Sequence, residues 1–161
     1  FSTKVSIGCC IFVIMEQIFT DEFFMKKALQ EAETAFEKGE IPVGAVIVID
    51  NRVIAKSHNL TELLHDVTAH AEMQAITSAA NFLGGKYLKD CTLYVTLEPC
   101  QMCAGALYWS QIGKIVIGAM DDKRGCSKVS PKIYHPKTQI ITGVLEETCE
   151  AMLKSFFKKL R

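Results

Sequence analysis

Two short segments of the chain carry side chains that bind metal ions and move protons. His70 and Glu72 lie close together in the sequence Thr-Ala-His-Ala-Glu, and Cys100 and Cys103 lie in Pro-Cys-Gln-Met-Cys. One imidazole and two thiols with this spacing are a typical ligand set for Zn²⁺. A catalytic zinc site usually has three protein ligands and a water molecule, whereas a structural site has four protein ligands.

The spacing within each segment suggests how the four side chains are used. Cys100 and Cys103 are three residues apart, so on a helix both sulfur atoms lie on one face. If that helix begins at Pro99, both thiols lie in its first turn, where the helix dipole stabilises thiolates. We expect His70 in the first turn of a second helix. Glu72, two residues further on, is expected to stay off the metal and to act as a proton shuttle.

Each part of this pattern also has a simpler explanation when it is taken alone. A single CxxC is often redox-active or half of a structural zinc site, and a single histidine usually belongs to the core or the surface. A structural site would need a fourth ligand, such as Cys91, Cys126 or His65, and none of these shares the close spacing. It would also leave Glu72 without a role. We therefore predict a catalytic zinc site.

The composition is that of a globular chain without net charge. The 161 residues are 49% hydrophobic and 22% charged, with 18 basic and 18 acidic side chains, and this length predicts one domain with its own core. Residues 1–112 carry 8 basic and 13 acidic side chains, and residues 113–161 carry 10 and 5. Either solvated helix faces or a basic surface for an anionic partner such as nucleic acid explains this imbalance.

The cysteine count and the N-terminal segment both bear on location. Seven scattered cysteines with one CxxC pair are not typical of a secreted disulfide-bonded domain, so we expect a cytoplasmic protein with Cys91, Cys126 and Cys149 as buried thiols. The apolar run at residues 7–15 is too short to span a membrane, and no membrane association is expected. We expect residues 1–14 to be an upstream extension or an expression artefact, and residues 15–161 to form a single domain.

Local patterns predict the elements that must position the site. Helices are expected at residues 21–38, from the cap Thr68 to Gly84, from Pro99 to Gly113, and around residues 149–160. Strands are expected at residues 42–49, 52–57, 92–96, 114–118 and 139–142, and a long loop with a short helical piece at 119–138. The order predicts an α/β fold, a three-layer α-β-α sandwich with a mixed five-stranded sheet. Strands 43–49 and 92–96 are expected as neighbours, which brings the helices that follow to one sheet edge.

The motifs resemble those of the zinc-dependent cytidine deaminase-like superfamily, whose nucleobase deaminases share the signature H-x-E…P-C-x-x-C. Within it, the chain is most similar to the tRNA-specific adenosine deaminases from about Glu22 to the C-terminus. The similar segments are residues 41–46, 58–59, 66–72, 93–100, 102–106 and 118–123. Residues 125–137 diverge most, and Val67 stands where the family usually has proline.

This resemblance implies a reaction and a cofactor. The reaction is hydrolytic deamination of adenosine to inosine at the wobble position of a tRNA anticodon, with the base flipped out of its loop. One Zn²⁺ per subunit, held by His70, Cys100 and Cys103, would activate the water that attacks C6 of adenine. Glu72 would carry protons from that water to N1 and to the leaving amine.

The resemblance also implies which residues contact the substrate. Asn59 would hydrogen-bond to the base, Val43 would line the pocket, and the backbone N–H of Ala71 would contact the base. Asp121 and Lys123 match family positions that contact the nucleotides beside the target, and each is equally well explained as an ordinary charged loop residue.

The same resemblance implies the partners. The aromatic and basic tail at residues 156–161 is similar to the final helix with which the family touches RNA, and a core stripe with solvated lysines explains it as well. A homodimer that binds the tRNA anticodon stem-loop across both subunits is implied. Residues 100–112 are the expected interface, with ordinary core packing as the alternative.

Two other functions remain open. A free-base deaminase acting on guanine or cytosine would use the same zinc motif, and residues 107–109 resemble guanine deaminases. Residues 118–123 and the basic tail favour the tRNA enzymes instead. A catalytically silent, zinc-stabilised binding module is the second alternative, and in that case Glu72 would be dispensable.

Overall fold

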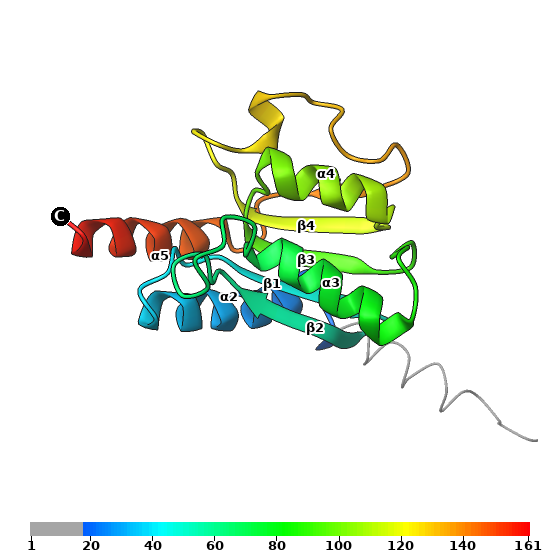
Figure 1. Ribbon diagram of the computed structural model, residues 1–161, viewed down its shortest axis with the longest axis horizontal. Coiled ribbons are helices and arrows are strands. Elements are labelled where there is room, and N and C mark those ends of the chain that lie inside the picture. Colours follow the sequence, from blue (N-terminus) through cyan, green and yellow to red (C-terminus); the bar gives the residue numbers. More distant parts are fainter. Residues whose placement is uncertain (1–17) are drawn as a thin grey trace, which may run out of the picture.

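The computed structural model describes residues 18–161 of the chain. Its elements are α2 (Asp21–Glu37), β1 (Gly44–Ile49), β2 (Arg52–His58), α3 (Ala71–Leu83), β3 (Thr92–Leu97), α4 (Gln101–Ser110), β4 (Lys114–Ala119), the 3-10 helix η1 (Cys126–Lys128), β5 (Gln139–Ile141) and α5 (Glu146–Lys159). The strands form one five-stranded sheet in the order β2-β1-β3-β4-β5. Helices α3 and α4 cover one face and helices α2 and α5 the other (Figure 1). The predicted three-layer α-β-α fold is confirmed.

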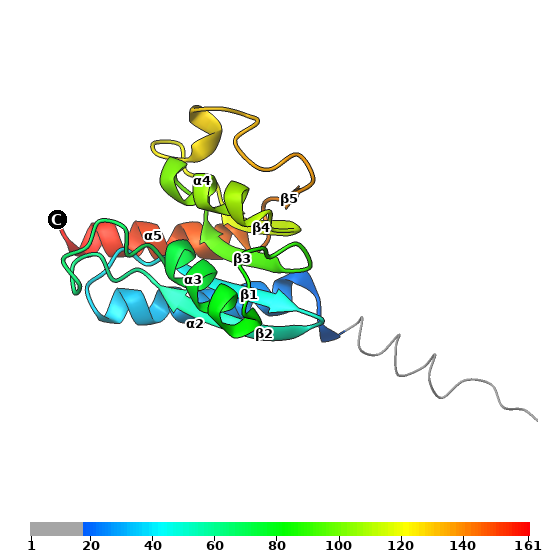
Figure 2. The same ribbon diagram turned by 45° about the vertical axis from the view of Figure 1, so that its right-hand side comes forward.

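The directions of the strands decide where the site lies. Strand β1 pairs antiparallel with both β2 and β3, whereas β3, β4 and β5 are parallel to one another. Strands β2 and β3 therefore run in the same direction and end at the same edge of the sheet. The N-termini of α3 and α4 lie at this edge (Figure 2). The expected pairing of β1 with β3 is confirmed. Because β1 runs antiparallel to β3, it ends at the opposite edge of the sheet, and the strand that leads to α3 is therefore β2.

Two apolar layers hold the helices against the sheet. Successive residues of a strand point to opposite faces, and here both faces are covered, which explains the unbroken apolar run of β1. The layer under α3 and α4 includes Ala45, Ile47, Leu93, Val95, Ile115 and Ile117. The layer under α2 and α5 includes Phe24, Met25, Ala28, Val46, Val116 and Cys149.

Helix α2 begins as its sequence predicts. The side chain of Thr20 accepts a hydrogen bond from the Phe23 N–H at 3.2 Å, which satisfies one of the free donors at the helix start. The rings of Phe19 and Phe24 stack with their centroids 6.0 Å apart, as expected of a hydrophobic staple. These contacts fix the direction in which α2 crosses the sheet.

Other expectations have mixed outcomes. Within residues 18–161, Cys91, Cys126 and Cys149 are buried and free of disulfide bonds, as predicted. The expected extension at residues 1–14 and the apolar run at 7–15 lie outside the described residues. No helix in the described part of the chain is long and apolar enough to cross a membrane.

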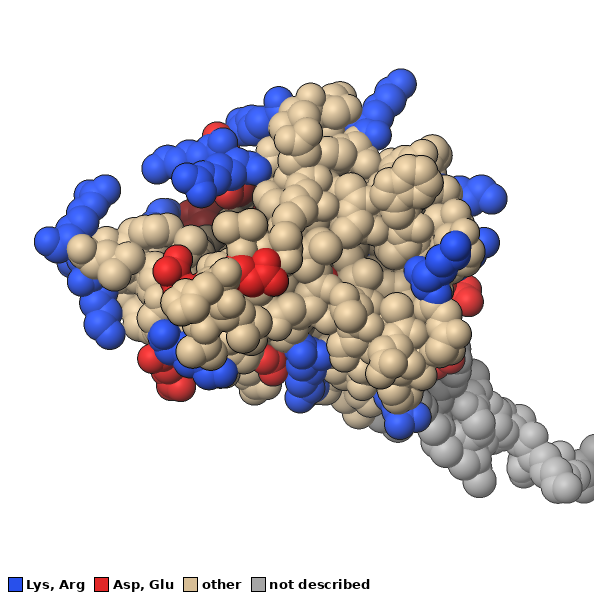
Figure 3. All heavy atoms as spheres, in the orientation of Figure 1, with Lys and Arg blue, Asp and Glu red and all other residues tan. Residues whose placement is uncertain are grey.

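Some of the basic side chains lie at the end of the molecule where α3 and α4 begin. Figure 3 shows Lys and Arg side chains at the end of α5 and along the loop between β4 and η1. Lys123 and Arg124 of this loop are exposed, as are Lys158, Lys159 and Arg161 of the tail.

Helix α2 packs tightly against the sheet at Gly44. A Cβ atom at this position would lie 2.0 Å from the Ala28 oxygen and 2.5 Å from the Ala32 nitrogen, both backbone atoms. We expect Gly44→Ala to lower the free energy of unfolding by about 2 kcal/mol, since the helix must move to make room. Urea unfolding measures this change. Gly85→Ala is the control, because a Cβ at Gly85 meets nothing within 4 Å; equal losses in both variants would contradict the prediction.

Candidate active site

The start of helix α3 differs from the prediction. His70 is the N-cap residue of α3 and lies just before its first turn, and Thr68 does not cap the helix. The Thr68 N–H and hydroxyl donate to Asp66 Oδ1 at 2.8 and 2.7 Å instead. Asn59, which follows β2, accepts a hydrogen bond from the Ala71 N–H at 3.0 Å through Oδ1. The side chain of Asn59, which follows β2, thus takes the place of an N-cap side chain at the start of α3.

Helix α4 also begins later than predicted. Cys100 is its N-cap residue, and Pro99 lies before the helix instead of at its first position. The backbone of Cys100 is extended and bridges to Gly125, while the Pro99 oxygen accepts a hydrogen bond from the Cys126 N–H at 3.0 Å. Pairing with this distant segment keeps the chain extended through Cys100, so the helix begins at the next residue.

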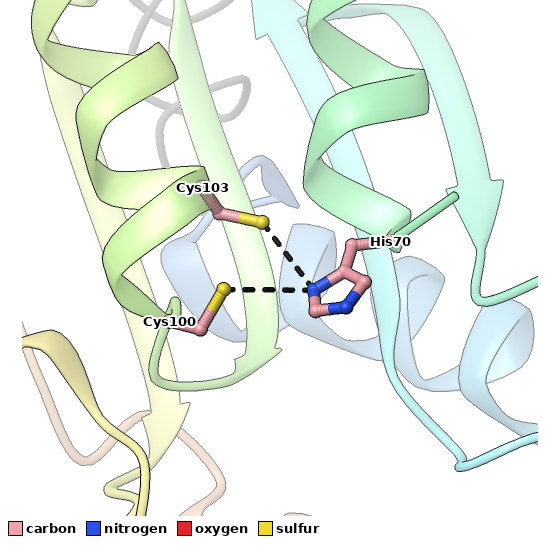
Figure 4. Close-up of side chains that lie close together, drawn as sticks. All are labelled: His70, Cys100 and Cys103. Carbon is pink, nitrogen blue, oxygen red and sulfur yellow. Dashed lines mark hydrogen bonds between the residues drawn. The ribbon is translucent and has the colours of Figure 1, made fainter. Parts of the chain in front are cut away.

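The two helix starts bring the three predicted ligands together. The Nδ1 atom of His70 lies 3.6 Å from the Cys100 sulfur and 3.5 Å from the Cys103 sulfur (Figure 4). One possible ligand atom from each residue lies within 4.8 Å of the others. His70 projects from the start of α3, and both cysteines project toward it from the start of α4.

The donor set fits a catalytic metal ion better than a structural one. Within residues 18–161 the group of His, Cys, Asp and Glu side chains close enough to share an ion contains only His70, Cys100 and Cys103. One imidazole nitrogen and two sulfurs suit Zn²⁺, and three protein ligands leave a position for water. Cys91, Cys126 and His65 are not in this group, so it has no fourth ligand of the kind that a structural site needs.

The cysteine pair is already partly prepared to bind a cation. Hydrogen bonds with the Cys103 side chain and with His70 lower the pKa of Cys100 to about 4. The pKa of Cys103 is raised, first by its hydrogen bond with Cys100 and then by burial. One thiolate therefore exists at neutral pH, and a bound metal ion would deprotonate the second thiol as well.

Glu72 lies next to this cluster and is 3% exposed. Burial raises the pKa of its carboxyl group to about 7, and the negative charge of Cys100 acts in the same direction. A carboxyl group with such a pKa can both accept and donate a proton near neutral pH. Glu72 is thus placed beside the cluster but outside the ligand group.

The structure places two predicted base-contacting residues at the same sheet edge. Val43 and Asn59 are buried, and the Asn59 N–H donates to the Val43 oxygen at 3.1 Å. The N–H of Ala71, also predicted to contact the base, is engaged by Asn59 Oδ1. With its oxygen held in this way, Asn59 has its amide NH₂ group to donate.

The other two predicted contact residues lie in the loop between β4 and η1. Asp121 Oδ1 accepts hydrogen bonds from the backbone N–H groups of Lys123 and Arg124 at 2.9 and 3.0 Å, so this side chain closes a local turn. Lys123 is exposed. The bridge from Gly125 to Cys100 holds the loop beside the cysteine pair.

Three residues of the site were missed at the level of sequence. The Ser57 hydroxyl donates to the Ala71 oxygen at 2.7 Å, and Gln74 Nε2 donates to the His58 oxygen at 2.7 Å. Both side chains fix the start of α3 to the end of β2. The third residue, Glu98, is 4% exposed and accepts hydrogen bonds from the loop after β4. For Glu98, the signal available in the sequence was a glutamate directly after an apolar strand.

Comparison with known proteins identifies the family. The model of the MafB19-like deaminase family matches residues 19–161. The tRNA-specific adenosine deaminase of Bacillus subtilis is 48% identical over 146 residues, which cover 88% of this chain and 91% of that protein. The chain belongs to the deaminase family that includes the tRNA-specific adenosine deaminases. The family predicted from the sequence motifs is confirmed, and with it the class of enzyme.

Solved structures agree with this assignment. A structure from studies of A-to-I editing by tRNA:A34 deaminases at the wobble position superimposes with a TM-score of 0.75 at 43% identity, covering 81% of this chain and 98% of that one. A guanine deaminase from Bacillus subtilis superimposes with a TM-score of 0.61 at 38% identity, covering 69% of this chain and 70% of that one.

The cluster predicts a specific pattern of metal loss. We expect the purified chain to contain zinc, and His70→Ala and Cys103→Ala to lose stoichiometric metal because two remaining ligands hold Zn²⁺ weakly. Metal content measured by mass spectrometry tests this. Cys149→Ala is the matched control, since it removes a buried thiol that is not in the cluster. Full zinc content in the His70→Ala and Cys103→Ala proteins would contradict the assignment.

Proposed function

We propose that this chain catalyses the hydrolytic deamination of adenosine to inosine at the wobble position of a tRNA anticodon. The observation that carries the proposal is the group formed by His70, Cys100 and Cys103 with the buried carboxyl of Glu72 beside it. The similarity to proteins named as tRNA-specific adenosine deaminases supports the choice of substrate.

The cofactor of the proposal is one Zn²⁺ per chain, held by His70, Cys100 and Cys103. When bound, zinc supplies Lewis acidity and lowers the pKa of a water molecule to about 7. The donor set, with one imidazole and two sulfurs facing each other, supports this assignment.

The protein side chains then have defined tasks. Glu72 accepts a proton from the attacking water and passes it to N1 of adenine, and it delivers the second proton to the amine at C6. The water oxygen stays on C6 as the carbonyl group of inosine, and ammonia leaves. The Asn59 amide donates a hydrogen bond to the base, and the buried Val43 forms an apolar wall beside it. Burial keeps competing water away from these groups.

The surface around the site suits an RNA substrate. Exposed Lys and Arg side chains of the loop after β4 and of the end of α5 lie at the same end of the molecule as the cluster (Figure 3). In this proposal they contact phosphates on either side of a flipped-out base, and such contacts make binding salt-dependent. Lys123 belongs to this surface.

Glu72→Gln tests the reaction and its mechanism together. We expect the variant to keep its zinc and to lose at least about 1000-fold in kcat, because an amide cannot carry the protons. Inosine formation in an anticodon stem-loop with adenosine at the wobble position measures the rate, with Glu62→Gln as control, since Glu62 is an exposed loop residue. Unchanged turnover in Glu72→Gln would remove Glu72 from the mechanism. If the wild type itself has no activity, a silent binding module would be favoured.

A free-base deaminase is the second candidate function. The structural similarity to a guanine deaminase at 38% identity supports it. The wild-type chain should be given the stem-loop, guanine, cytosine and adenosine separately, with ammonia release as the readout. Ammonia from free guanine or cytosine and none from the stem-loop would exclude the proposed tRNA substrate.

We also propose a cytoplasmic location, supported by the free thiols. Cys91, Cys126 and Cys149 are buried and unpaired in the described part of the chain, which suits a reducing compartment.

The outer surface of α3 and α4 supports the proposal of a homodimer. These helices lie side by side on one face of the sheet (Figures 1 and 2). Trp109 of α4 is 77% exposed and Val67, before α3, is 84% exposed. An open groove of about 500 Å³ lies between the loop that contains Leu64 and the outer side of α3. A second copy of the chain would cover the exposed Trp109 and Val67 side chains.

Trp109→Glu tests the dimer. We expect this variant to sediment as a monomer at concentrations at which the wild type is a dimer, because a charge would be buried in the interface. Leu160→Glu is the control, since Leu160 is 68% exposed at the end of α5, which packs on the opposite face of the sheet from α3 and α4. A dimeric Trp109→Glu protein with unchanged affinity would exclude this interface.

A further inference from the structure

Glu98 is a buried acidic residue without a role in the proposed chemistry. It follows β3 directly, stands two residues before Cys100, and is 4% exposed. Its Oε2 atom accepts a hydrogen bond from the Asp121 N–H at 3.1 Å, and Oε1 accepts one from the Ser127 N–H at 2.9 Å. The Cys126 thiol lies 3.7 Å from Oε1 as a further donor. Glu98 is thus bonded to both ends of the segment 121–127.

The segment 121–127 packs directly on this carboxyl group. A Cβ atom at Gly125 would lie 2.0 Å from Glu98 Oε2, so only glycine allows the approach. On either side of Gly125 the backbone is tied to the metal-site segment, because Gly125 bridges to Cys100 and the Cys126 N–H donates to the Pro99 oxygen at 3.0 Å. The carboxyl group and the two backbone contacts hold the segment beside the cysteine pair.

The same hydrogen bonds continue to the exposed basic side chains. Glu98 holds the N–H of Asp121, and Asp121 Oδ1 in turn holds the N–H groups of Lys123 and Arg124. The position of these two exposed residues relative to the cluster therefore depends on Glu98.

We propose that Glu98 is a positioning residue for the anionic substrate: it holds the segment 121–127 so that Lys123 and Arg124 meet the phosphates beside the target nucleotide. The inference rests on the proposed function for the identity of that substrate. Glu98 lies outside the group of possible metal ligands, and both of its oxygens are bonded to the segment, so it acts on substrate binding and not on the chemical step.

Glu98→Gln tests this role with little change in volume. The amide keeps one acceptor oxygen, so one of the two backbone N–H groups loses its partner. We expect full zinc content, a KM for the anticodon stem-loop raised by about 10-fold, and a smaller change in kcat. Hydrogen exchange of the amides in residues 121–127 should become faster while that of α3 stays unchanged.

Two further variants make the test specific. Lys123→Ala should raise KM in the wild type but have a much smaller effect in Glu98→Gln, because the lysine is then no longer held in place. Glu40→Gln is the matched control. Glu40 is 1% exposed and accepts the N–H groups of Glu62 and Leu63 at 3.2 and 2.8 Å, so it anchors a different loop. Its variant should lose similar stability with KM unchanged.

Several results would overturn the proposal. Loss of zinc or a fall in kcat at constant KM in Glu98→Gln would mean that Glu98 acts on the metal centre. Full additivity with Lys123→Ala, or an equal rise in KM in Glu40→Gln, would reduce its role to general stability. If the wild type does not act on the stem-loop, the proposed function fails, and hydrogen exchange in residues 121–127 still decides separately whether Glu98 anchors this segment.

Discussion

The position of β1 between β2 and β3 is the constraint on which the site depends. Because β1 is antiparallel to both neighbours, β2 and β3 run in the same direction and end at one edge of the sheet. A loop with several turns, residues 59–70, joins β2 to α3, whereas only three residues separate β3 from α4, and each helix begins directly after a candidate ligand residue, His70 in one case and Cys100 in the other. The imidazole and the thiols therefore face each other across the gap between two helix starts.

Three buried glutamates of the structure have different roles. Glu40 accepts backbone N–H groups of the loop after β2, and Glu98 accepts those of the segment after β4, so each glutamate holds one loop in place. Glu72 lies instead beside the cysteine thiols, and burial raises the pKa of its carboxyl group to about 7. A carboxyl whose oxygens are engaged by the backbone stabilises a conformation, whereas one beside the metal ligands is available for proton transfer.

Much of the fold was predictable because its signals are local. Thr20 and Phe24 mark the start of α2, and the apolar run of β1 marks a strand buried on both faces. Between the two expected strands, Asp50 and Asn51 both have positive φ, as a tight hairpin requires. The starts of α3 and α4 were predicted too early, since the contacts that set them come from Asn59 and Gly125, which are remote in sequence.

The sequence by itself determined the chemical identity of the site and the family. An imidazole, two thiols and a carboxyl at fixed spacing define a zinc deaminase motif whatever the details of the fold, because ligand chemistry belongs to the residue type. Only the tertiary structure decided the distances of 3.5 and 3.6 Å within the cluster and the roles of the hydrogen-bonding residues around it. The Asp121 side chain closes a turn, and Glu98 anchors a segment 23 to 29 residues away. Local patterns do not encode such pairings, because each partner becomes available only when the sheet has brought the strand ends together.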